Sequence, residues 1–264
     1  MSLLTLRPVA VDFTDEQIVR HDQQRELGPD GDAQLALLFA EVFPANEPVL
    51  DVGGGSGTAL PQLTRAGLQV VLMDVSSAML SAGSCRGVPR VQADLRALPL
   101  PDRSVGGVHA AFVLQNIPEW TRAVAEIARV LLPTGTVLVA WGQSATDAVA
   151  AAVRDHLLRA LQDTGAAVGV AAAAAGLDTV DDGHVAFTRN GLAIRSEHRV
   201  TGRQTRSIRQ LAVIRANNPF MSEATHQQRR EAVQRTLSWA ASTLGDIDAA
   251  RSISAELLLY RYRR

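Results

Sequence analysis

A glycine-rich segment carries the clearest chemistry in this chain of 264 residues. Val49 to Gly57 reads VLDVGGGSG, in which an apolar run that contains Asp51 leads into Gly53, Gly55 and Gly57. Glycine lets the backbone turn sharply and lets a ligand approach the main chain closely, and a helix that follows presents unpaired N–H groups. The segment therefore predicts a ligand site at the junction between a strand and a helix.

A second acidic residue, Asp74, ends the next apolar run, about 20 residues later. A carboxylate at this place accepts hydrogen bonds from the hydroxyls of a ribose. Dinucleotide oxidoreductases combine the same acid with a G-x-G-x-x-G turn, but here the third glycine comes one residue too early. The two features predict an adenosine-containing ligand and leave both a nicotinamide cofactor and a methyl donor open.

The elements that position these residues alternate short apolar runs with helical segments, which is typical of a parallel sheet covered on both faces. The expected core strands are Pro48 to Val52, Gln69 to Asp74, Arg90 to Ala93, Gly106 to Phe112 and Thr136 to Trp141. Before the last of these we expect a helix over Thr121 to Leu132, ended by Pro133 and Gly135. With two further strands, Leu192 to Val200 and Glu256 to Arg263, the sequence predicts an α/β fold: a doubly wound, mostly parallel seven-stranded sheet of the Rossmann-like kind.

The same patterns predict four parts along the chain. Residues 1–46 would form N-terminal helices that act as a lid, and residues 47–204 the α/β core that binds the cofactor. Residues 205–245 are helical in pattern and too long for a hairpin loop, so we expect a helical substrate cap inserted before the last strand. Residues 246–264 would return to the sheet as that strand.

From Phe13 to Trp141 the sequence resembles the class I methyltransferases, in particular the small-molecule enzymes of the type 11 group. The resemblance rests on VLDVGGGSG, DVSSAML (Asp74 to Leu80), QADLRALPLPDRSV (Gln92 to Val105), AFVLQNIPEW (Ala111 to Trp120) and EIARVLLPTGTVLVAW (Glu126 to Trp141), in this order. It implies that S-adenosylmethionine is the cofactor and S-adenosylhomocysteine the product.

The resemblance also implies roles for single residues. Asp51, Gly53, Gly55 and Gly57 would surround the methionine part of the cofactor, and Asp74 would bind the ribose, with Val75 and Met79 in the same cofactor site. Asp94 and Leu95 would lie by the adenine, and Gln115 would face both the cofactor and the acceptor. Structural roles stay open for Asp74 as a helix cap, for Asp94 as a loop acid and for Gln115 as a structural amide.

The function implied is methylation of a small molecule, at oxygen or carbon of a secondary metabolite or a quinone-like compound. A protein that keeps the cofactor fold but binds a partner or catalyses another reaction is one alternative, and an NAD-dependent oxidoreductase is another. No Asp-Pro-Pro-Tyr or Asn-Pro-Pro-Tyr sequence follows the fourth strand, which argues against methylation of nucleic-acid amines.

Histidines are the candidate general bases, because imidazole can take up a proton near neutral pH. We expect His21 and then His226 to be the catalytic candidates, since His21 stands where many relatives carry a tyrosine. His109, inside the fourth strand, is expected to be buried and structural. For an anionic acceptor, the arginines available in the expected cap region are Arg203, Arg206, Arg209 and Arg215.

Composition excludes several other classes. Cys85 is the only cysteine, and the histidines and carboxylates show no metal-ligand spacing, so neither an intrachain disulfide nor a metal site is expected. No run is apolar enough for a membrane helix. All 26 positive side chains are arginines, of which 13 lie in residues 195–264 against 6 acidic residues. We find no compact basic patch interleaved with aromatic side chains, which disfavours nucleic acid as a partner. We expect a cytoplasmic monomer or homodimer that binds neither nucleic acid nor membrane.

Overall fold

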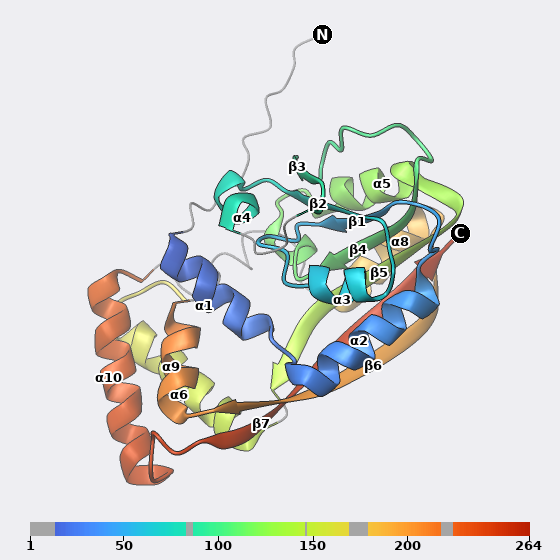
Figure 1. Ribbon diagram of the computed structural model, residues 1–264. Helices are drawn as coiled ribbons and strands as arrows, with labels where there is room; N and C mark the ends of the chain where they lie inside the picture. The colour runs from blue at the N-terminus through green and yellow to red at the C-terminus, as the bar shows by residue number, and fades with distance from the viewer. Residues whose placement is uncertain (1–13, 83–86, 146, 169–178, 218–223) are drawn as a thin grey trace.

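The computed structural model describes residues 14–82, 87–145, 147–168, 179–217 and 224–264 (Figure 1). Cys85 and the first 13 residues of the expected lid lie outside this part of the chain. None of the helices in the described part combines the length and the apolar character that crossing a bilayer requires.

The helices and strands follow one another much as the hydrophobic pattern predicts. The strands are β1 (Val49–Val52), β2 (Val70–Asp74), β3 (Arg90–Gln92), β4 (Val105–Ala111), β5 (Leu131–Ala145), β6 (Ala193–Arg206) and β7 (Arg251–Arg263). The helices are α1 (Asp15–Arg25), α2 (Gly28–Val42), α3 (Leu60–Arg65), α4 (Ser77–Ala82), α5 (Trp120–Val130), α6 (Ala148–Asp163), α8 (Val180–Arg189), α9 (Ile208–Ala216) and α10 (His226–Thr243), with a short 3₁₀ helix η1 at Leu114–Asn116.

These strands form one sheet in the order β3-β2-β1-β4-β5-β7-β6. The pairs among β1 to β5 are parallel, whereas β7 runs antiparallel to both β5 and β6. The strand order reverses between β1 and β4, which is the point where ligands bind in open α/β sheets. The predicted doubly wound, mostly parallel seven-stranded sheet is confirmed.

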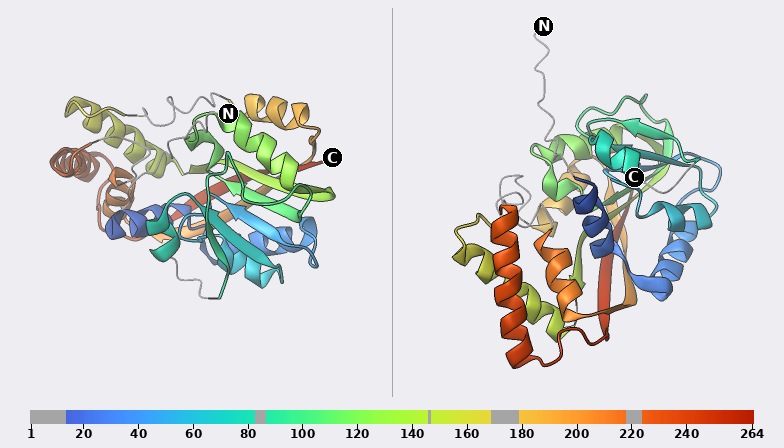
Figure 2. Two further views of the ribbon diagram at one scale, coloured as in Figure 1. Left: turned by 90° about the horizontal axis from the view of Figure 1, so that it is seen from above. Right: turned by 60° about the vertical axis from the view of Figure 1, so that its left-hand side comes forward.

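Helices cover both faces of the sheet (Figure 2). On one face α2 and α3 pack through Phe39, Leu60 and Leu63, and on the other α5 and α8 pack through Ile127 and Phe187. Because side chains alternate along a strand, neighbouring residues of β1 contribute to opposite faces. Leu50 faces the α5 side, while the adjacent Val49 faces the α2 side.

The helices α6, α9 and α10 form a separate group beside the sheet, at the far ends of β6 and β7 (Figure 1). Their shared core contains Val153, Leu211, Leu237 and Ile253, the last of which comes from β7. The helical segment expected before the last strand is therefore present as α9 and α10. It contacts α1 through α9 and packs mainly against α6.

Several boundaries differ from the expected ones, including those of β5, which was expected to span only Thr136 to Trp141. The helix expected to run to Leu132 ends at Val130, because the chain turns extended at Leu131 and this residue already pairs with Val105 of β4. The last two strands are longer than predicted because β6 and β7 pair with each other along their whole length, from Ala193 with Arg263 to Arg206 with Arg251. This pairing lies beyond the reach of any local sequence pattern.

Candidate active site

A pocket opens at the carboxyl ends of β1, β2 and β4, where α1 and α2 also contribute to its wall. Its lining contains most of the residues predicted for the cofactor and the base: Asp51, Gly53, Gly55, Asp74, Val75, Met79, Asp94, Leu95 and His21. The parallel sheet brings these residues together because successive strands end at the same edge.

The glycine turn after β1 needs glycine for different reasons at different positions. Gly53, Gly55 and Gly57 all have positive φ angles, of 61°, 60° and 90°. A Cβ at Gly53 would lie 2.1 Å from a methyl group of Val113, so the turn lies tightly against the segment after β4. A Cβ at Gly55 would meet nothing closer than Met79 at 3.8 Å, which leaves the backbone of Gly55 open to the pocket.

Asp51 is buried, and its two carboxylate oxygens have different surroundings. Oδ1 lies 2.8 Å from Nδ1 of His109. Oδ2 is buried and has no hydrogen-bond partner in the described part of the chain. A Cβ built on Gly54 would lie 2.5 Å from Oδ2, so this oxygen faces the glycine turn. A buried acceptor without a donor is energetically costly, which marks Oδ2 as an atom that a ligand can satisfy.

Asp74 connects the end of β2 to the same turn. Its Oδ2 accepts a hydrogen bond from the backbone N–H of Gly55 at 2.9 Å, and Oδ1 accepts one from Ser76 at 2.8 Å. Burial raises the pKa of Asp74 above its ordinary value, although these two N–H donors act in the opposite direction. The hydroxyl of Ser76, and not Asp74, caps α4 by accepting from the N–H of Met79.

Asp94 lies in the loop after β3 and is paired with Arg96. The Nη2 of Arg96 lies 2.7 Å from Oδ2, and Nε donates to both carboxylate oxygens. Burial alone would raise the pKa of Asp94, but the hydrogen bonds from Arg96 outweigh it and lower the pKa. The backbone N–H of Arg96 also donates to Oδ1 at 2.9 Å, so Arg96 supplies donors to both carboxylate oxygens.

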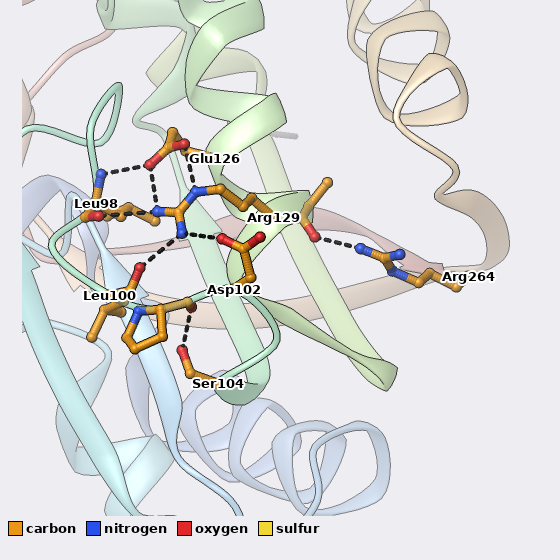
Figure 3. Close-up of polar contacts among 9 residues, drawn as sticks. Leu98, Leu100, Asp102, Ser104, Glu126, Arg129 and Arg264 are labelled. Atoms are coloured by element: carbon orange, nitrogen blue, oxygen red, sulfur yellow. Dashed lines mark hydrogen bonds and ion pairs between the residues drawn. The ribbon is translucent and has the colours of Figure 1, made fainter.

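The rest of this loop is fastened to α5 by one arginine (Figure 3). Arg129 donates to the backbone carbonyls of Leu98 and Leu100 and to the carboxylates of Glu126 and Asp102. Glu126 in turn accepts from the N–H of Leu98 at 2.8 Å. These contacts fix the chain just after the pocket residues Asp94 to Arg96.

The helix α1 lies over the glycine turn and is tied to it. Asp22 accepts a hydrogen bond from the hydroxyl of Ser56 at 2.6 Å, and Nδ1 of His21 lies 3.5 Å from the same carboxylate oxygen. The end of α1 is held from outside by an ion pair between Glu26 and Arg206 of β6. The predicted lid residue His21 therefore lies in the pocket wall.

Arg25, the last residue of α1, supplies a positive charge to the pocket. Its guanidinium carbon lies 3.7 Å from the centre of the Phe112 ring, directly after β4. Burial lowers the pKa of Arg25 to about 10, although the Asp22 carboxylate nearby raises it, so the side chain stays charged at neutral pH. Within the described residues no carboxylate forms an ion pair with it.

Comparisons with known proteins agree with this geometry. A family described as a methyltransferase domain matches residues 50–139. A demethylmenaquinone methyltransferase of Mycobacterium bovis (strain BCG / Pasteur 1173P2) is 37% identical over 143 residues, which cover 54% of this chain and 61% of the relative. Residues 50–139 are thus similar to a methyltransferase domain, which agrees with the resemblance in the sequence. The match thus spans about three fifths of the length of this curated relative.

Solved structures show that the class I methyltransferase fold extends over nearly the whole chain. The [4+2]-cyclase SpnF superposes with a TM-score of 0.55 at 18% identity, covering 93% of this chain and 92% of the cyclase. An N-methyltransferase of Haemonchus contortus, in complex with phosphomonomethylethanolamine and S-adenosylhomocysteine, has a TM-score of 0.55 at 15% identity and covers 95% of this chain and 58% of its own. At these identities the likeness concerns the fold alone.

Three predicted site residues are not in the pocket lining. Gly57 faces α3 and not the pocket, because a Cβ at this position would lie 2.6 Å from the side chain of Leu60. The amide of Gln115 donates to the carbonyl of Trp141 at 3.2 Å, which favours the structural role left open for it. His226 is exposed at the start of α10, because α10 packs against α6 and not over the strand ends.

The four arginines considered for an anionic acceptor also lie outside the pocket lining. Arg206 pairs with Glu26 and Arg209 with Asp248, while Arg215 belongs to the α6 side of α9, near Arg154 and Asp155. Arg203 borders a shallow second hollow beside Gly202. The arginines in the pocket lining are Arg25 and Arg96 instead.

Sequence reasoning missed Arg25, His109, Phe112 and Asn116 as lining residues. Phe112 has a φ of 57°, a left-handed conformation that a bulky side chain adopts rarely and that is frequent at functional sites. This strain arises in a segment that the sequence pattern reads as regular strand. No signal in the sequence placed the end of α1 against Phe112, since the contact joins two distant elements.

Proposed function

We propose that this protein is an S-adenosylmethionine-dependent methyltransferase that acts on a small, largely apolar acceptor. The observation that carries the proposal is the pair of carboxylates on adjacent strands, the buried Asp51 and the half-buried Asp74, on either side of the open backbone at Gly55. This arrangement suits a donor that offers an ammonium group and a ribose to the two carboxylates and that lies close to the backbone of Gly55.

The residues present fit the amino-acid and nucleoside parts of such a donor. The buried Oδ2 of Asp51, which has no partner, would accept from the ammonium group. Asp74 would accept from the ribose hydroxyls, with Val75 and Met79 beside it, and Asp94 and Leu95 would hold the adenine. When bound, the donor supplies an activated methyl group on its sulfonium.

The acceptor side of the pocket is mainly apolar. Leu27 and Leu35 from the N-terminal helices, Phe112 and Ile117 after β4, and Leu257 of β7 contribute to its wall. Such a wall suits a quinone-like compound, and the curated relative from Mycobacterium bovis is a demethylmenaquinone methyltransferase. Arg25 would bind an anionic oxygen of the acceptor, because a half-buried guanidinium that forms no ion pair within the described residues gains from a close anion.

The protein would contribute to the reaction mainly by placing the acceptor relative to the methyl group of the donor. The lid helix α1, tied to the turn by Asp22 and Ser56, would exclude water and hold the acceptor in line with the transferred group. Where the acceptor has to lose a proton, His21 is the histidine of the lid that lines the pocket.

Two measurements test this function. Isothermal titration calorimetry should detect uptake of S-adenosylhomocysteine and none of NAD. The purified protein, incubated with a donor labelled in its methyl group, should then transfer the label to demethylmenaquinone or a short-chain analogue. Binding without transfer to quinones or phenols would point to a different acceptor or to the non-methyltransferase alternative, and a lack of binding would refute the proposal.

A further inference from the structure

His109 lies at the floor of the pocket, and its imidazole ring is held on two sides. Asp51 and His109 are Cα partners across the parallel pairing of β1 with β4, and both are at most 2% exposed. On the other side, the ring of Phe39 from α2 meets the imidazole edge-on, with 5.0 Å between ring centres and an interplanar angle of 71°. The ring therefore has little freedom to turn.

The direction of the hydrogen bond follows from elementary chemistry. An ionised carboxylate can only accept, so with Asp51 ionised, Nδ1 of His109 carries the hydrogen and donates it to Oδ1. This bond occupies Oδ1. The second oxygen, Oδ2, is left facing the glycine turn at Gly54 without a protein donor.

We propose that His109 is a positioning residue for the donor: by holding Oδ1 of Asp51, it presents Oδ2 to the ammonium group of the donor's amino-acid part. The inference rests on the proposed function, since it concerns the same donor. It assigns a role to a side chain that the sequence pattern marks only as part of a buried strand.

Loss of the His109 donor would weaken the site for two reasons. The Asp51 carboxylate would then have two buried oxygens without a protein partner, which is unfavourable for the ionised form. It would also be free to rotate about its side-chain torsion, since no other described residue donates to it. Either change reduces the attraction for a cation at Oδ2 and leaves the nucleoside part of the site intact.

The test compares two ligands on three variants. S-adenosylhomocysteine contains the amino-acid part, whereas 5′-methylthioadenosine shares the adenosine and lacks that part. His109→Asn places an amide N–H near the position of Nδ1, and His109→Leu removes the donor. His109→Gln, whose amide reaches the position of Nε2 instead, is a second variant without the correct donor and serves if the leucine variant does not fold.

The expected result is a selective loss of the amino-acid contact. We expect His109→Leu or His109→Gln to lower the affinity for S-adenosylhomocysteine by about 10- to 100-fold, the range for a lost hydrogen bond to a charged group. The affinity for 5′-methylthioadenosine should change by less than about twofold. His109→Asn should restore most of the affinity. In an Asp51→Asn background the same substitutions should have no further selective effect.

Three results would overturn the proposal: equal losses for both ligands, no rescue by asparagine, or an undiminished effect in the Asp51→Asn background. Circular dichroism and thermal melting show that the variants compared are folded. If the wild-type protein fails to bind S-adenosylhomocysteine, the proposed function is wrong. If the wild-type protein binds this ligand and the affinity does not depend on His109, only the role of His109 is wrong.

Discussion

The backbone N–H of Gly55 donates to the carboxylate of Asp74 across 2.9 Å, which joins the turn after β1 to the end of β2. Two motifs that are 19 residues apart in the chain thereby become one rigid wall of the pocket. Partial burial at this junction raises the pKa of Asp74, although the hydrogen bond from Gly55 acts in the opposite direction.

The raised pKa of Asp74 predicts that donor affinity falls on mild acidification. Above this pKa the carboxylate is ionised and accepts from the ribose, and below it one oxygen becomes a donor and the charge is lost. The affinity for S-adenosylhomocysteine should therefore be constant near neutral pH. As the pH is lowered, the affinity should begin to fall at a higher pH than it would if Asp74 had the ordinary aspartate pKa of about 4.

Calorimetric titrations between about pH 4.5 and pH 8, with folding checked at each pH, measure this dependence. Asp74→Asn removes the titrating group, so its affinity should be low and nearly independent of pH in this range. A wild-type profile that matches that of Asp74→Asn would contradict the assignment.

Gly55→Ala should impair donor binding more than it impairs folding. Gly55 and Gly67 both have positive φ angles, of 60° and 76°, and a Cβ at Gly67 would meet nothing within 4 Å. Alanine at either position should lower the free energy of unfolding by about 1 to 2 kcal/mol, the cost of a left-handed conformation. Only at Gly55 would the methyl group enter the pocket.

Denaturant unfolding and calorimetry on the two alanine variants separate these effects. We expect Gly55→Ala to lower the affinity for S-adenosylhomocysteine by more than about tenfold and Gly67→Ala to leave this affinity unchanged. Equal affinities in the two variants would show that the donor does not approach the backbone at Gly55.

Arg25→Met should raise the KM for an acceptor that carries an anionic oxygen. The substitution keeps an apolar stem over Phe112 and removes the charge, so we expect an increase of about 10- to 100-fold with little change in the melting temperature. Arg209→Met is the matched control, because Arg209 is exposed and paired with Asp248 outside the pocket.

Initial-rate kinetics with varied acceptor, together with calorimetry for S-adenosylhomocysteine, check this prediction. A loss of donor affinity at an unchanged acceptor KM would assign Arg25 to the donor's carboxylate instead of the acceptor. An unchanged KM and an unchanged donor affinity would remove Arg25 from the site.

Arg129→Ala should loosen the loop that carries Asp94 and Leu95. Arg129 joins the carbonyls of Leu98 and Leu100 to Glu126 of its own helix (Figure 3). Because its side chain is partly exposed, we expect the free energy of unfolding to fall by only about 1 to 2 kcal/mol. The affinity for 5′-methylthioadenosine should fall as well, since this loop faces the adenosine part.

Denaturant unfolding measures the stability, hydrogen exchange of residues 93–104 measures the loosening of the loop, and calorimetry measures the affinity for 5′-methylthioadenosine. Arg235→Ala removes an exposed ion pair with Glu231 on α10 and should change none of the three quantities. Unchanged exchange in the loop of Arg129→Ala would show that the loop is held by its apolar residues alone.

The sequence by itself determined the fold class, the glycine turn and the carboxylates at Asp51 and Asp74. These features depend on local rules: glycine spacing sets the turn, and apolar runs set where parallel strands end. Only the tertiary structure decided what those residues face. His109 lies beside Asp51 because β1 and β4 pair in one particular register, although the two residues are 58 positions apart. Arg25 reaches Phe112, and Gln115 turns toward Trp141, because helix packing places distant segments together, and such non-local contacts leave no periodic signal in the chain.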